Sequence, residues 1–375
     1  MPRDSLFGER IIWTGRPKIA EASRGVRALS ALLFVLSIIS LSFAVVISFA
    51  LKTPPIGPML FAIWCAGLGV AARQLPRLWL ENARYVITEN HVITIFGPFR
   101  RTIERKSISF ARIFWHPRLS NAGDLELVRA VPTGALRRRL MLRLSGVSLP
   151  DRIWAIVRGA ENVAPLGDGG KPLAQRLDRG ERVMWSASPR PKFRTYLPHS
   201  QREWASLGIA VFLLFAVGKM LDNTVPALHK VVESGLPVRS FAFIALVFGL
   251  SLAVAMVLAA ACYIAYDAVI RPATLMKDTR YLITNKRVLI QRDLEELHLD
   301  RERIVDVIDT PAGDGVRHLF MVLDGPRARA LAASGAFGEL GRGPHLRPVF
   351  EAVEDAEGAS QILRQPTDPE LPHAA

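Results

Sequence analysis

Long apolar runs alternate along this chain with stretches of shorter hydrophobic period. The apolar runs cover residues 28–51, 56–72, 204–221 and 241–266, and Lys219 is the one ionisable residue within them. A membrane-spanning helix needs about 20 such residues. The runs come in pairs, each pair joined by one connecting segment, so the pattern predicts four transmembrane helices arranged as two helical hairpins.

The segment after each pair of runs has the signature of a β-hairpin. Residues 84–88 read Arg-Tyr-Val-Ile-Thr and residues 280–284 read Arg-Tyr-Leu-Ile-Thr; each is followed by a polar pair and then by a second apolar run. A polar pair between two β-branched runs is typical of a tight hairpin. A second repeated word, Gly-Glu-Arg followed by Trp, begins at Gly8 and again at Gly180. The chain is therefore predicted to be a tandem pair of like units.

Each unit is predicted to end in a small antiparallel β-domain closed by a helix. Alternating apolar residues predict strands within 107–115, 124–128 and 140–144, and Pro150 with Asp151 predicts a helix start. The second unit has predicted strands within 301–308 and 313–323 and a predicted helix over 348–363. The predicted parts are a cytoplasmic N-terminal segment 1–27, a transmembrane hairpin 28–80, a first β-domain 81–162, a linker and second lead-in 163–203, a second transmembrane hairpin 204–268, a second β-domain 269–364 and a disordered tail 365–375.

Charge orients the predicted spans. The chain carries 48 Lys and Arg against 34 Asp and Glu, and its mean hydropathy is +0.22. This basic excess fits nucleic-acid binding, but beside four apolar runs it is better explained by the enrichment of Lys and Arg in cytoplasmic loops. Residues 73–202 are rich in Arg and Lys, whereas 222–239 is nearly neutral. Both termini are therefore predicted to face the cytoplasm.

Two smaller features complete the topology. Cap residues at 224–226 and Gly235 predict a short helix on the outer surface between the third and fourth spans. Cys65 and Cys262 both lie within apolar runs, so no disulfide framework is indicated.

The repeated words resemble those of the bacterial membrane proteins with pleckstrin-homology-like (PH-like) domains. That family has a Gly-Glu lead-in with Trp and Pro, a helical hairpin, an Arg-Tyr-x-Ile-Thr-Asn-x-Arg-Val word and a later Gly-Asp. The matching residues here are Gly8, Glu9, Trp13, Pro17, Arg84, Tyr85, Ile87, Thr88, Gly123 and Asp124, then Gly180, Glu181, Trp185, Arg280, Tyr281, Ile283, Thr284, Asn285, Arg287, Val288, Gly313 and Asp314. The first copy departs from the pattern, with Glu89-Asn90 and His91 in place of the Asn-x-Arg. The resemblance implies two PH-like domains, each capped by a C-terminal helix, at a bacterial inner membrane.

Motifs that carry chemistry are absent from the sequence. There is no phosphate loop, nucleophile elbow, dinucleotide fingerprint or metal-binding helix, so an enzyme is disfavoured and no cofactor or metal is expected. The carboxylates Asp293, Glu295, Glu296, Asp300 and Glu302 interleave with Arg292, Arg301 and Arg303, and this mixture predicts a solvated face. Transport is disfavoured because ion pathways need ionisable groups inside the spans.

Basic residues are the candidates for binding anionic lipid head groups. Beside an anionic leaflet each charge adds about 1 kcal/mol of attraction. The candidate residues are Arg100, Arg101, Arg105, Lys106, Arg137, Arg138, Arg139, Arg280, Lys286 and Arg287. The alternative is that these charges only set the topology.

Small residues in the spans are candidates for close helix packing. They are spaced as Gly67-x-x-x-Ala71 and Gly249-x-x-x-Ala253, and they suit either a helix contact or the general abundance of Gly and Ala in membrane helices. The functional hypothesis is a non-enzymatic membrane protein whose cytoplasmic modules bind anionic lipid, protein partners or a second copy. An accessory subunit of an envelope transporter or lipid-handling complex is the alternative, and nucleic acid is not an expected partner.

Overall fold

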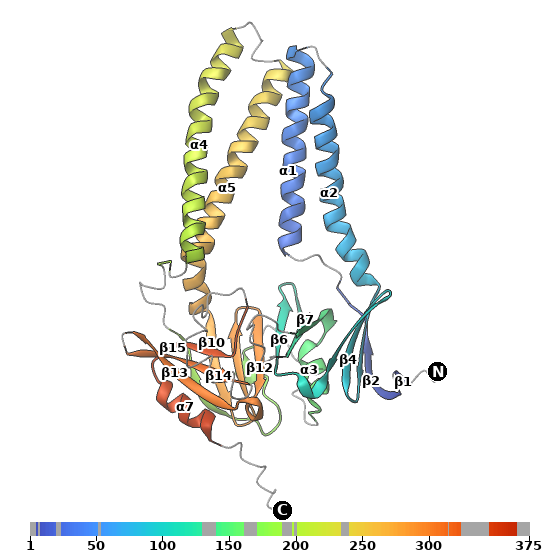
Figure 1. The fold of residues 1–375 in the computed structure, drawn as a ribbon, viewed down its shortest axis with the longest axis vertical. Helices are drawn as coiled ribbons and strands as arrows, with labels where there is room; N and C mark the ends of the chain where they lie inside the picture. Colours follow the sequence, from blue (N-terminus) through green and yellow to red (C-terminus); the bar gives the residue numbers. More distant parts are fainter. Residues whose placement is uncertain are drawn as a thin grey trace, which may run out of the picture. The chain divides into compact units, whose positions relative to one another are not determined.

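The computed structural model describes residues 5–6, 8–19, 24–51, 54–129, 140–160, 171–189, 197–198, 201–233, 240–313, 315–323 and 345–365. The chain divides into two compact units. The helical unit comprises Glu21–Leu78 and Phe193–Pro272, and the β-unit comprises Met1–Ala20, Trp79–Lys192 and Ala273–Ala375. Figure 1 labels their elements.

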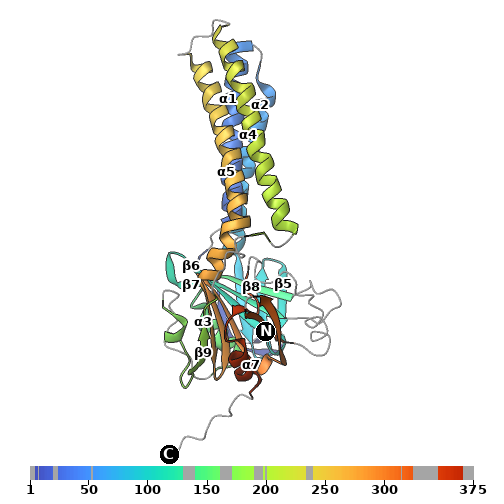
Figure 2. The ribbon, with the colours of Figure 1, turned by 90° about the vertical axis from the view of Figure 1, so that its left-hand side faces the viewer.

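Four long helices make up the helical unit. They are α1 (Arg24–Val46), continued by a π-helical segment (Ile47–Leu51), α2 (Ile56–Glu81), α4 (Gln201–Glu233) and α5 (Phe241–Lys277). Figures 1 and 2 show the four running alongside one another. Each is long and apolar enough to cross a membrane. The prediction of four such helices is confirmed.

The loop between α4 and α5 differs from the prediction. A separate short helix was expected over 224–235, but α4 continues through Pro226 to Glu233 as one helix. Proline removes a single backbone hydrogen bond, the one to the carbonyl of Asp222. Asp222 is exposed, so its carbonyl is not left without a donor in an apolar core, and the helix is not broken.

Serine hydroxyls bind α1 to α2. Three hydroxyls of α1 donate to α2 carbonyls, namely Ser30 to Gly69 (2.8 Å), Ser37 to Ala62 (2.8 Å) and Ser40 to Pro58 (2.7 Å). In an apolar surrounding, such hydrogen bonds and small residues hold helices together because burial of apolar surface offers no advantage there. The pair is therefore a packed hairpin.

Close packing involves one of the two predicted glycines. A Cβ on Gly249 would lie 2.8 Å from the Ser42 Cβ, so α5 approaches α1 at this point. A Cβ on Gly67 would meet nothing within 4 Å, whereas one on Gly69 would touch the Phe34 ring at 3.4 Å. The close contact of α2 is made by Gly69, two residues beyond Gly67, and Gly67 makes no such contact among the described residues.

The β-unit contains two modules with the same order of elements. Module 1 consists of β2 (Glu9–Gly15), β3 (Ala83–Thr88), β4 (His91–Phe96), β5 (Phe99–Glu104), β6 (Phe110–His116), β7 (Leu119–Arg129), β8 (Leu140–Ser148) and α3 (Pro150–Arg158), with β1 (Ser5–Leu6) paired to β2. Module 2 consists of β9 (Val183–Ala187), β10 (Thr279–Thr284), β11 (Arg287–Arg292), β12 (Glu295–Asp300), β13 (Asp306–Gly313), β14 (Val316–Val322), β15 (Val349–Val353) and α7 (Ala356–Arg364). Both predicted hairpins are confirmed, with two-residue turns at 89–90 and 285–286.

Each module takes its first strand from the segment before its helical hairpin. β2 pairs with β3 and β9 pairs with β10, so residues 9–15 and 183–187 belong to the sheets rather than to a free N-terminal segment and a linker. Residues 171–180, also expected to be linker, pack on the second module, where Leu173 joins Leu282 and Leu289 in a small apolar cluster. The modules are therefore discontinuous in sequence.

One sheet runs through both modules. Its strand order is β8-β7-β6-β12-β11-β10-β9, and the join is an antiparallel ladder between β6 and β12 in which Ile113 faces Glu296 and Ala111 faces His298. A five-stranded sheet, β1-β2-β3-β4-β5, completes module 1, and a three-stranded sheet, β13-β14-β15, completes module 2. Because the long sheet is continuous, the two modules form one body.

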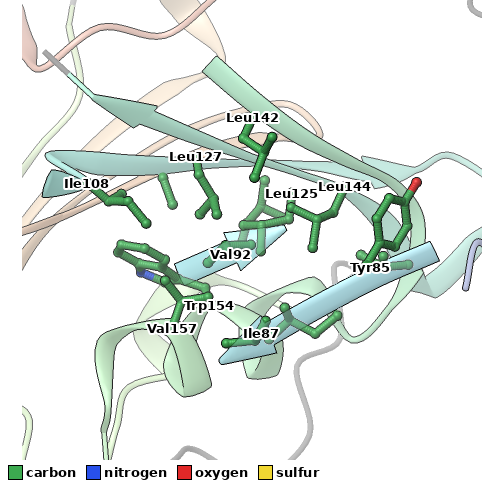
Figure 3. Close-up of a cluster of buried hydrophobic side chains, with 14 of the residues drawn as sticks. Tyr85, Ile87, Val92, Ile108, Leu125, Leu127, Leu142, Leu144, Trp154 and Val157 are labelled. Carbon is green, nitrogen blue, oxygen red and sulfur yellow. The ribbon is translucent and has the colours of Figure 1, made fainter. Parts of the chain in front are cut away.

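The β-unit has two large apolar cores, one centred on each module. Core 1, shown in Figure 3, packs Tyr85 and Ile87 of β3 against Leu125 and Leu127 of β7 and Trp154 of α3. Tyr85 also exchanges hydrogen bonds of 3.0 Å with the backbone of Ser145 in β8, and burial raises the pKa of Tyr85 to about 12.

Core 2 has the same construction, but it also includes side chains of module 1. Tyr281 packs against Phe350 of β15 and accepts a 3.0 Å hydrogen bond from the Glu351 amide, while α7 contributes Leu363. Phe110 and Val128, which belong to module 1, are part of the same cluster. Module 2 therefore has a complete core only together with module 1.

The end of module 2 differs from the prediction of one helix over 348–363. Residues 349–353 form β15, and α7 begins only at Ala356. Phe350 and Val353 are three positions apart, which fits a helix face, yet both are buried from a strand because Ala352 has φ = 49° and the ladder with β14 shifts register there. A bulge of this kind changes which side chains face the core.

Candidate functional site

The repeated sequence words have a structural explanation in module 2. The Glu181 carboxylate accepts hydrogen bonds from Thr284 (2.7 Å) and from Nε and Nη2 of Arg287 (2.8 Å each). Burial raises the pKa of Glu181, but the hydrogen bonds and charge of Arg287 together with the Thr284 bond leave it below its ordinary value. The Gly-Glu lead-in is thereby attached to the β10–β11 turn.

Module 1 contains the matching contact. Glu9 accepts from the Thr88 hydroxyl (2.5 Å), and its carboxylate lies 2.9 Å from Nδ1 of His91. His91 thus occupies the place of Arg287, which explains how the first copy tolerates a departure from the second. In both modules the glutamate of the Gly-Glu word accepts from the threonine of the Ile-Thr word and joins the first strand to the hairpin turn, a contact that the sequence alone did not show.

Arg105 holds the C-terminal helix of module 1. It donates from Nε to the carbonyl of Val157 (2.9 Å), from Nη2 to Ile156 (2.7 Å) and from Nη1 to Glu89 (2.7 Å) and Thr88 (3.3 Å). Cations are favourable at the free carbonyls that end a helix. Arg105 was a candidate for lipid binding, and these internal bonds remove it from that set.

Arg301 does the same in module 2. Its guanidinium donates to the carbonyls of Ile362 and Gln365 at the end of α7 and to those of Thr284 and Asn285 in the hairpin turn. The side chain is buried, so it is no part of a solvated face. One arginine per module therefore fastens the helix end to the hairpin turn.

The dense charges of β12 are buried, which corrects the prediction of a solvated face. Glu295 and Glu296 are 8% and 0% exposed, and Arg292 is also buried, whereas Asp293, Glu302 and Arg303 are exposed. β12 lies inside the long sheet, with core 2 on one face and α3 with the 171–178 segment on the other. The sequence pattern could not show this because it does not show the β6–β12 pairing.

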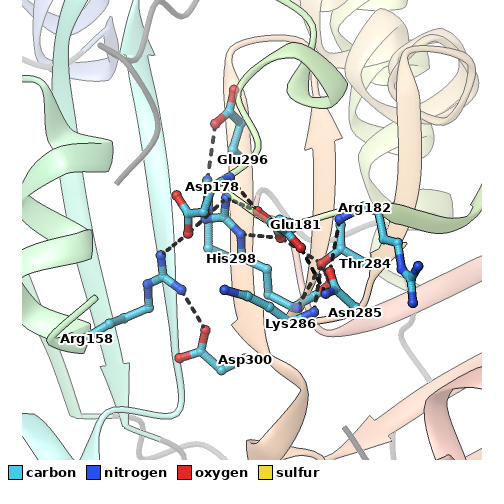
Figure 4. Close-up of polar contacts among 12 residues, drawn as sticks. Arg158, Asp178, Glu181, Arg182, Thr284, Asn285, Lys286, Glu296, His298 and Asp300 are labelled. Atoms are coloured by element: carbon cyan, nitrogen blue, oxygen red, sulfur yellow. Dashed lines mark hydrogen bonds and ion pairs between the residues drawn. The ribbon is translucent and has the colours of Figure 1, made fainter. Parts of the chain in front are cut away.

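A charged network covers the second face, as Figure 4 shows. Glu296 is paired with Arg176 and lies 3.2 Å from Nε2 of His298. Arg287 places Nη1 3.3 Å from Nδ1 of His298. Since Arg287 can only donate, Nδ1 of His298 accepts and Nε2 donates to Glu296.

Arg158 links this network to module 1. From the last turn of α3 it donates to Asp178 (2.9 Å) and to Asp300 (3.2 Å). It therefore joins α3, the segment before β9 and the end of β12. These bonds cross from one module to the other, so the network holds the two modules together.

Burial shapes the protonation of the network. It raises the pKa of Glu296, yet the hydrogen bond from His298 and the charge of Arg176 leave that pKa below its ordinary value. Burial lowers the pKa of His298, so the ring is neutral at pH 7, and it raises the pKa of Asp151.

A cavity bordered by Asp151, Arg158, Arg176 and His298 leaves ≈ 20 Å³ for the centres of water molecules. That is room for about one water, whereas small-molecule sites measure about 300–1,000 Å³. Among the described residues, no group of three His, Cys, Asp or Glu side chains is placed to hold a metal ion. The network therefore has the properties of a structural junction.

The lipid-binding candidates fall into different places. Arg287 is buried on Glu181, and Arg137, Arg138 and Arg139 lie outside the described residues. Lys106 follows β5 at the end beside the 89–90 turn, since Arg105 donates its amide to Asn90. Lys286 lies in the corresponding turn of module 2. A six-residue strand is about 20 Å long, so the four residues 100, 101, 105 and 106 do not form one patch.

Arg100, Arg101 and Arg280 lie at the other end of their hairpins. β3 starts directly after α2, its first residue pairs with Phe96, and Phe96 pairs with Phe99. Trp79, in the last turn of α2, stacks on Phe99 with ring centroids 6.2 Å apart. The exposed Arg100 and Arg101 therefore follow an aromatic pair at the end of a candidate membrane span.

Comparison of the chain with family models, with curated proteins and with solved structures finds no match.

Proposed function

We propose that this is a multi-pass protein of the bacterial inner membrane, with both termini cytoplasmic, whose two modules are tandem PH-like domains. The order of elements supports this: each module has four strands, three further strands and a C-terminal helix. We propose that it is not an enzyme and that module 1 binds anionic lipid head groups through the tip of the β4–β5 hairpin.

The observation that carries the lipid proposal is the stack of Trp79 on Phe99. Both rings are more than half exposed, at 56% and 63%, although they are large and apolar. Aromatic side chains at the end of a membrane span favour the head-group layer, where an apolar body and a polar edge are both accommodated. Arg100 and Arg101 follow the stack directly and supply the positive charge that an anionic head group requires.

Distance along the chain supports the same assignment. Trp79 follows Ala72, the end of the second apolar run, by seven residues, which is about 10 Å of helix. Electrostatic attraction extends about 8–10 Å in physiological salt, so Arg100 and Arg101 are within reach of the head groups. Arg280 follows Tyr266, the end of the fourth run, by 14 residues and lies about 20 Å along. The lipid contact is therefore assigned to module 1.

Native mass spectrometry of the full-length protein with added phosphatidylglycerol or phosphatidylcholine tests the proposal. Replacing Arg100 and Arg101 by Gln removes about 1 kcal/mol of attraction per charge, so binding of phosphatidylglycerol falls about fivefold for each. Phosphatidylcholine binding stays unchanged, and added salt reduces the difference.

The double variant with Lys106→Gln and Lys286→Gln is the matched control. It removes the same charge at the opposite ends of the hairpins and should keep full phosphatidylglycerol binding. Equal binding by both double variants would mean that the charges at 100 and 101 only set the topology, and a protein partner would become the better assignment for the hairpin.

A further inference from the structure

The join between the modules pairs β6, the fifth strand of module 1, with β12, the fourth strand of module 2, in the long sheet. The corresponding strands are β5 in module 1 and β13 in module 2. Both stand at the outer edge of their sheets, and neither has a further strand partner among the described residues.

Corresponding positions in the two modules can be assigned from Arg105 and Arg301, the arginines that join the end of each C-terminal helix to the hairpin turn of its module. Arg105 and Arg301 make the same contacts and are 196 positions apart. With this spacing β5 (Phe99–Glu104) corresponds to β12 (Glu295–Asp300) residue by residue. Likewise, residues 307–310 of β13 correspond to 111–114 of β6.

We propose that β5 of one copy of this chain pairs with β13 of a second copy and repeats the internal β6–β12 join. Within the chain Glu296 faces Ile113 and Leu297 faces Arg112. The same register between copies places Arg100 opposite Asp309 and Arg101 opposite Ile308. Opposite charges directly across a ladder are stabilising. Arg100 and Asp309 are both exposed. Asp309 is already paired with Arg317 of β14 at 2.5 Å, so in the proposed contact it would lie between two arginines.

A second pair of charges agrees with the same arrangement. Across the internal join Arg158, the last residue of α3, donates to Asp300, the last residue of β12, at 3.2 Å. The corresponding residues are Arg364, the last residue of α7, and Glu104, the last residue of β5. The arginine and the carboxylate are both retained. Within its own chain Arg364 donates to the carbonyl of Val307 at 3.0 Å, which holds it beside β13. Arg100 with Asp309 and Arg364 with Glu104 would both place opposite charges across the proposed contact.

The membrane tethers are compatible with the repeat. β3 begins two residues after α2 ends at Glu81, and β10 begins two residues after α5 ends at Lys277. Corresponding ends of corresponding strands therefore follow the helices in the chain, in module 1 and in module 2. Contacts of this head-to-tail kind form a ring where they close.

One substitution sets the strength of the contact. Phe110 of β6 fills part of core 2 across the internal join, but its counterpart in β13 is Asp306. The contact between copies therefore has no buried aromatic side chain at this position. It depends on backbone hydrogen bonds between the edge strands and on ion pairs. Association should be strong at low salt and weak at high salt, because screening acts on exposed charges.

Charge reversal with mixing provides the first test, and neither residue used belongs to the lipid hairpin tip. The full-length wild type, Glu104→Arg and Arg364→Glu are compared by native mass spectrometry at low salt. Wild type gives oligomers, and each variant alone gives at least fivefold less, because like charges then meet. A mixture of the two variants gives dimers, since one interface again joins Arg to Glu. Failure of the mixture to dimerise, or a monomeric wild type, overturns the proposal.

Cross-linking in membranes provides the second test. In a background of Cys65→Ser and Cys262→Ser, copies with Arg101→Cys are coexpressed with differently tagged copies carrying Ile308→Cys. Oxidation should join the two tags in a disulfide, because these positions are predicted to face each other. In the control, copies with Arg10→Cys, an exposed position on β2, are used in place of the copies with Arg101→Cys. Cross-linking no greater than in this control excludes the proposed register.

Discussion

β5 of module 1 and β12 of module 2 occupy the same place in their modules, yet one is exposed and the other is buried. Arg100 is exposed at a sheet edge, whereas its counterpart Glu296 is 0% exposed and paired with Arg176. The difference comes from the neighbour: β6 covers β12, and no described strand covers β5. Corresponding residues of a repeat therefore acquire different roles from their position in the assembly, not from the module fold.

The largest expected effect is at the buried member of this pair. Glu296→Gln keeps the shape but leaves Arg176 with an uncompensated buried charge, and breaking a buried pair costs about 3–5 kcal/mol. Arg100→Gln changes an exposed residue and should cost less than about 0.5 kcal/mol. Thermal unfolding of the purified protein should show a Tm lower by about 10 °C for the first and unchanged for the second. Similar losses in both would contradict the contrast between the strands.

A loss of stability of intermediate size is expected when Arg301 or Arg105 is replaced, because each joins the C-terminal helix of its module to the hairpin turn. Arg301→Gln leaves carbonyls at the end of α7 without donors in a buried site, at a cost of about 2–3 kcal/mol. Arg105→Gln should cost about 1 kcal/mol, because its half-buried site admits water. Hydrogen exchange of 356–364 and of 150–158 checks the order. If α3 loses more protection from exchange than α7, burial does not explain the different contributions of Arg105 and Arg301.

The smallest expected effect is the pH dependence of the junction. The folded-state pKa of His298 is lowered, chiefly by burial, so the unfolded chain binds its proton first as pH falls below about 6.5. Stability is therefore lost on acidification through this window, by up to about 1.4 kcal/mol per pH unit for one proton. The lowered pKa of Glu296 acts in the same direction at lower pH. The guanidinium groups of Arg287 and Arg176 face the His298 ring, and their charge also lowers its pKa.

His298→Gln removes this titrating ring and should reduce the slope of stability between pH 7 and 5.5, measured by unfolding at each pH. Burial also lowers the pKa of His318 and His345, so part of the slope should remain. Module 1 has Thr102 at the corresponding position and therefore contributes no such titration. An unchanged slope in the variant would assign the pH dependence to another group.

Local sequence patterns predicted those structural features that depend only on residues close together in the chain. The four apolar helices and the hairpin turns at 89–90 and 285–286 follow from runs of apolar residues and polar pairs. The β6–β12 ladder does not, because it joins residues 181 to 187 positions apart, and nothing local marks β12 as an inner strand. The burial of Glu296 and His298 was missed for that reason. The retained glutamates Glu9 and Glu181 were the available signal, since an isolated repeated carboxylate implies a partner.

The candidate lipid site was predicted in part for a similar reason. Counting basic residues identified Arg100 and Arg101, but it also included Arg105 and Arg287, whose side chains bind internal partners. Composition does not distinguish an arginine that faces lipid from one that donates to backbone carbonyls. The Trp79 and Phe99 stack depends on tertiary structure and could not be counted at all.

The pairing of β2 with β3 makes the β-unit a check on membrane insertion. During synthesis β2 leaves the ribosome before α1 and α2, and its partner β3 follows them; β9 and β10 are separated by α4 and α5 in the same way. The strands can meet only when the intervening helices return the chain to the side on which it started. A hairpin that crosses once would leave the two halves of a ladder on opposite sides, with their backbone hydrogen-bonding groups unpaired. Correct topology is thus a condition for forming these two ladders.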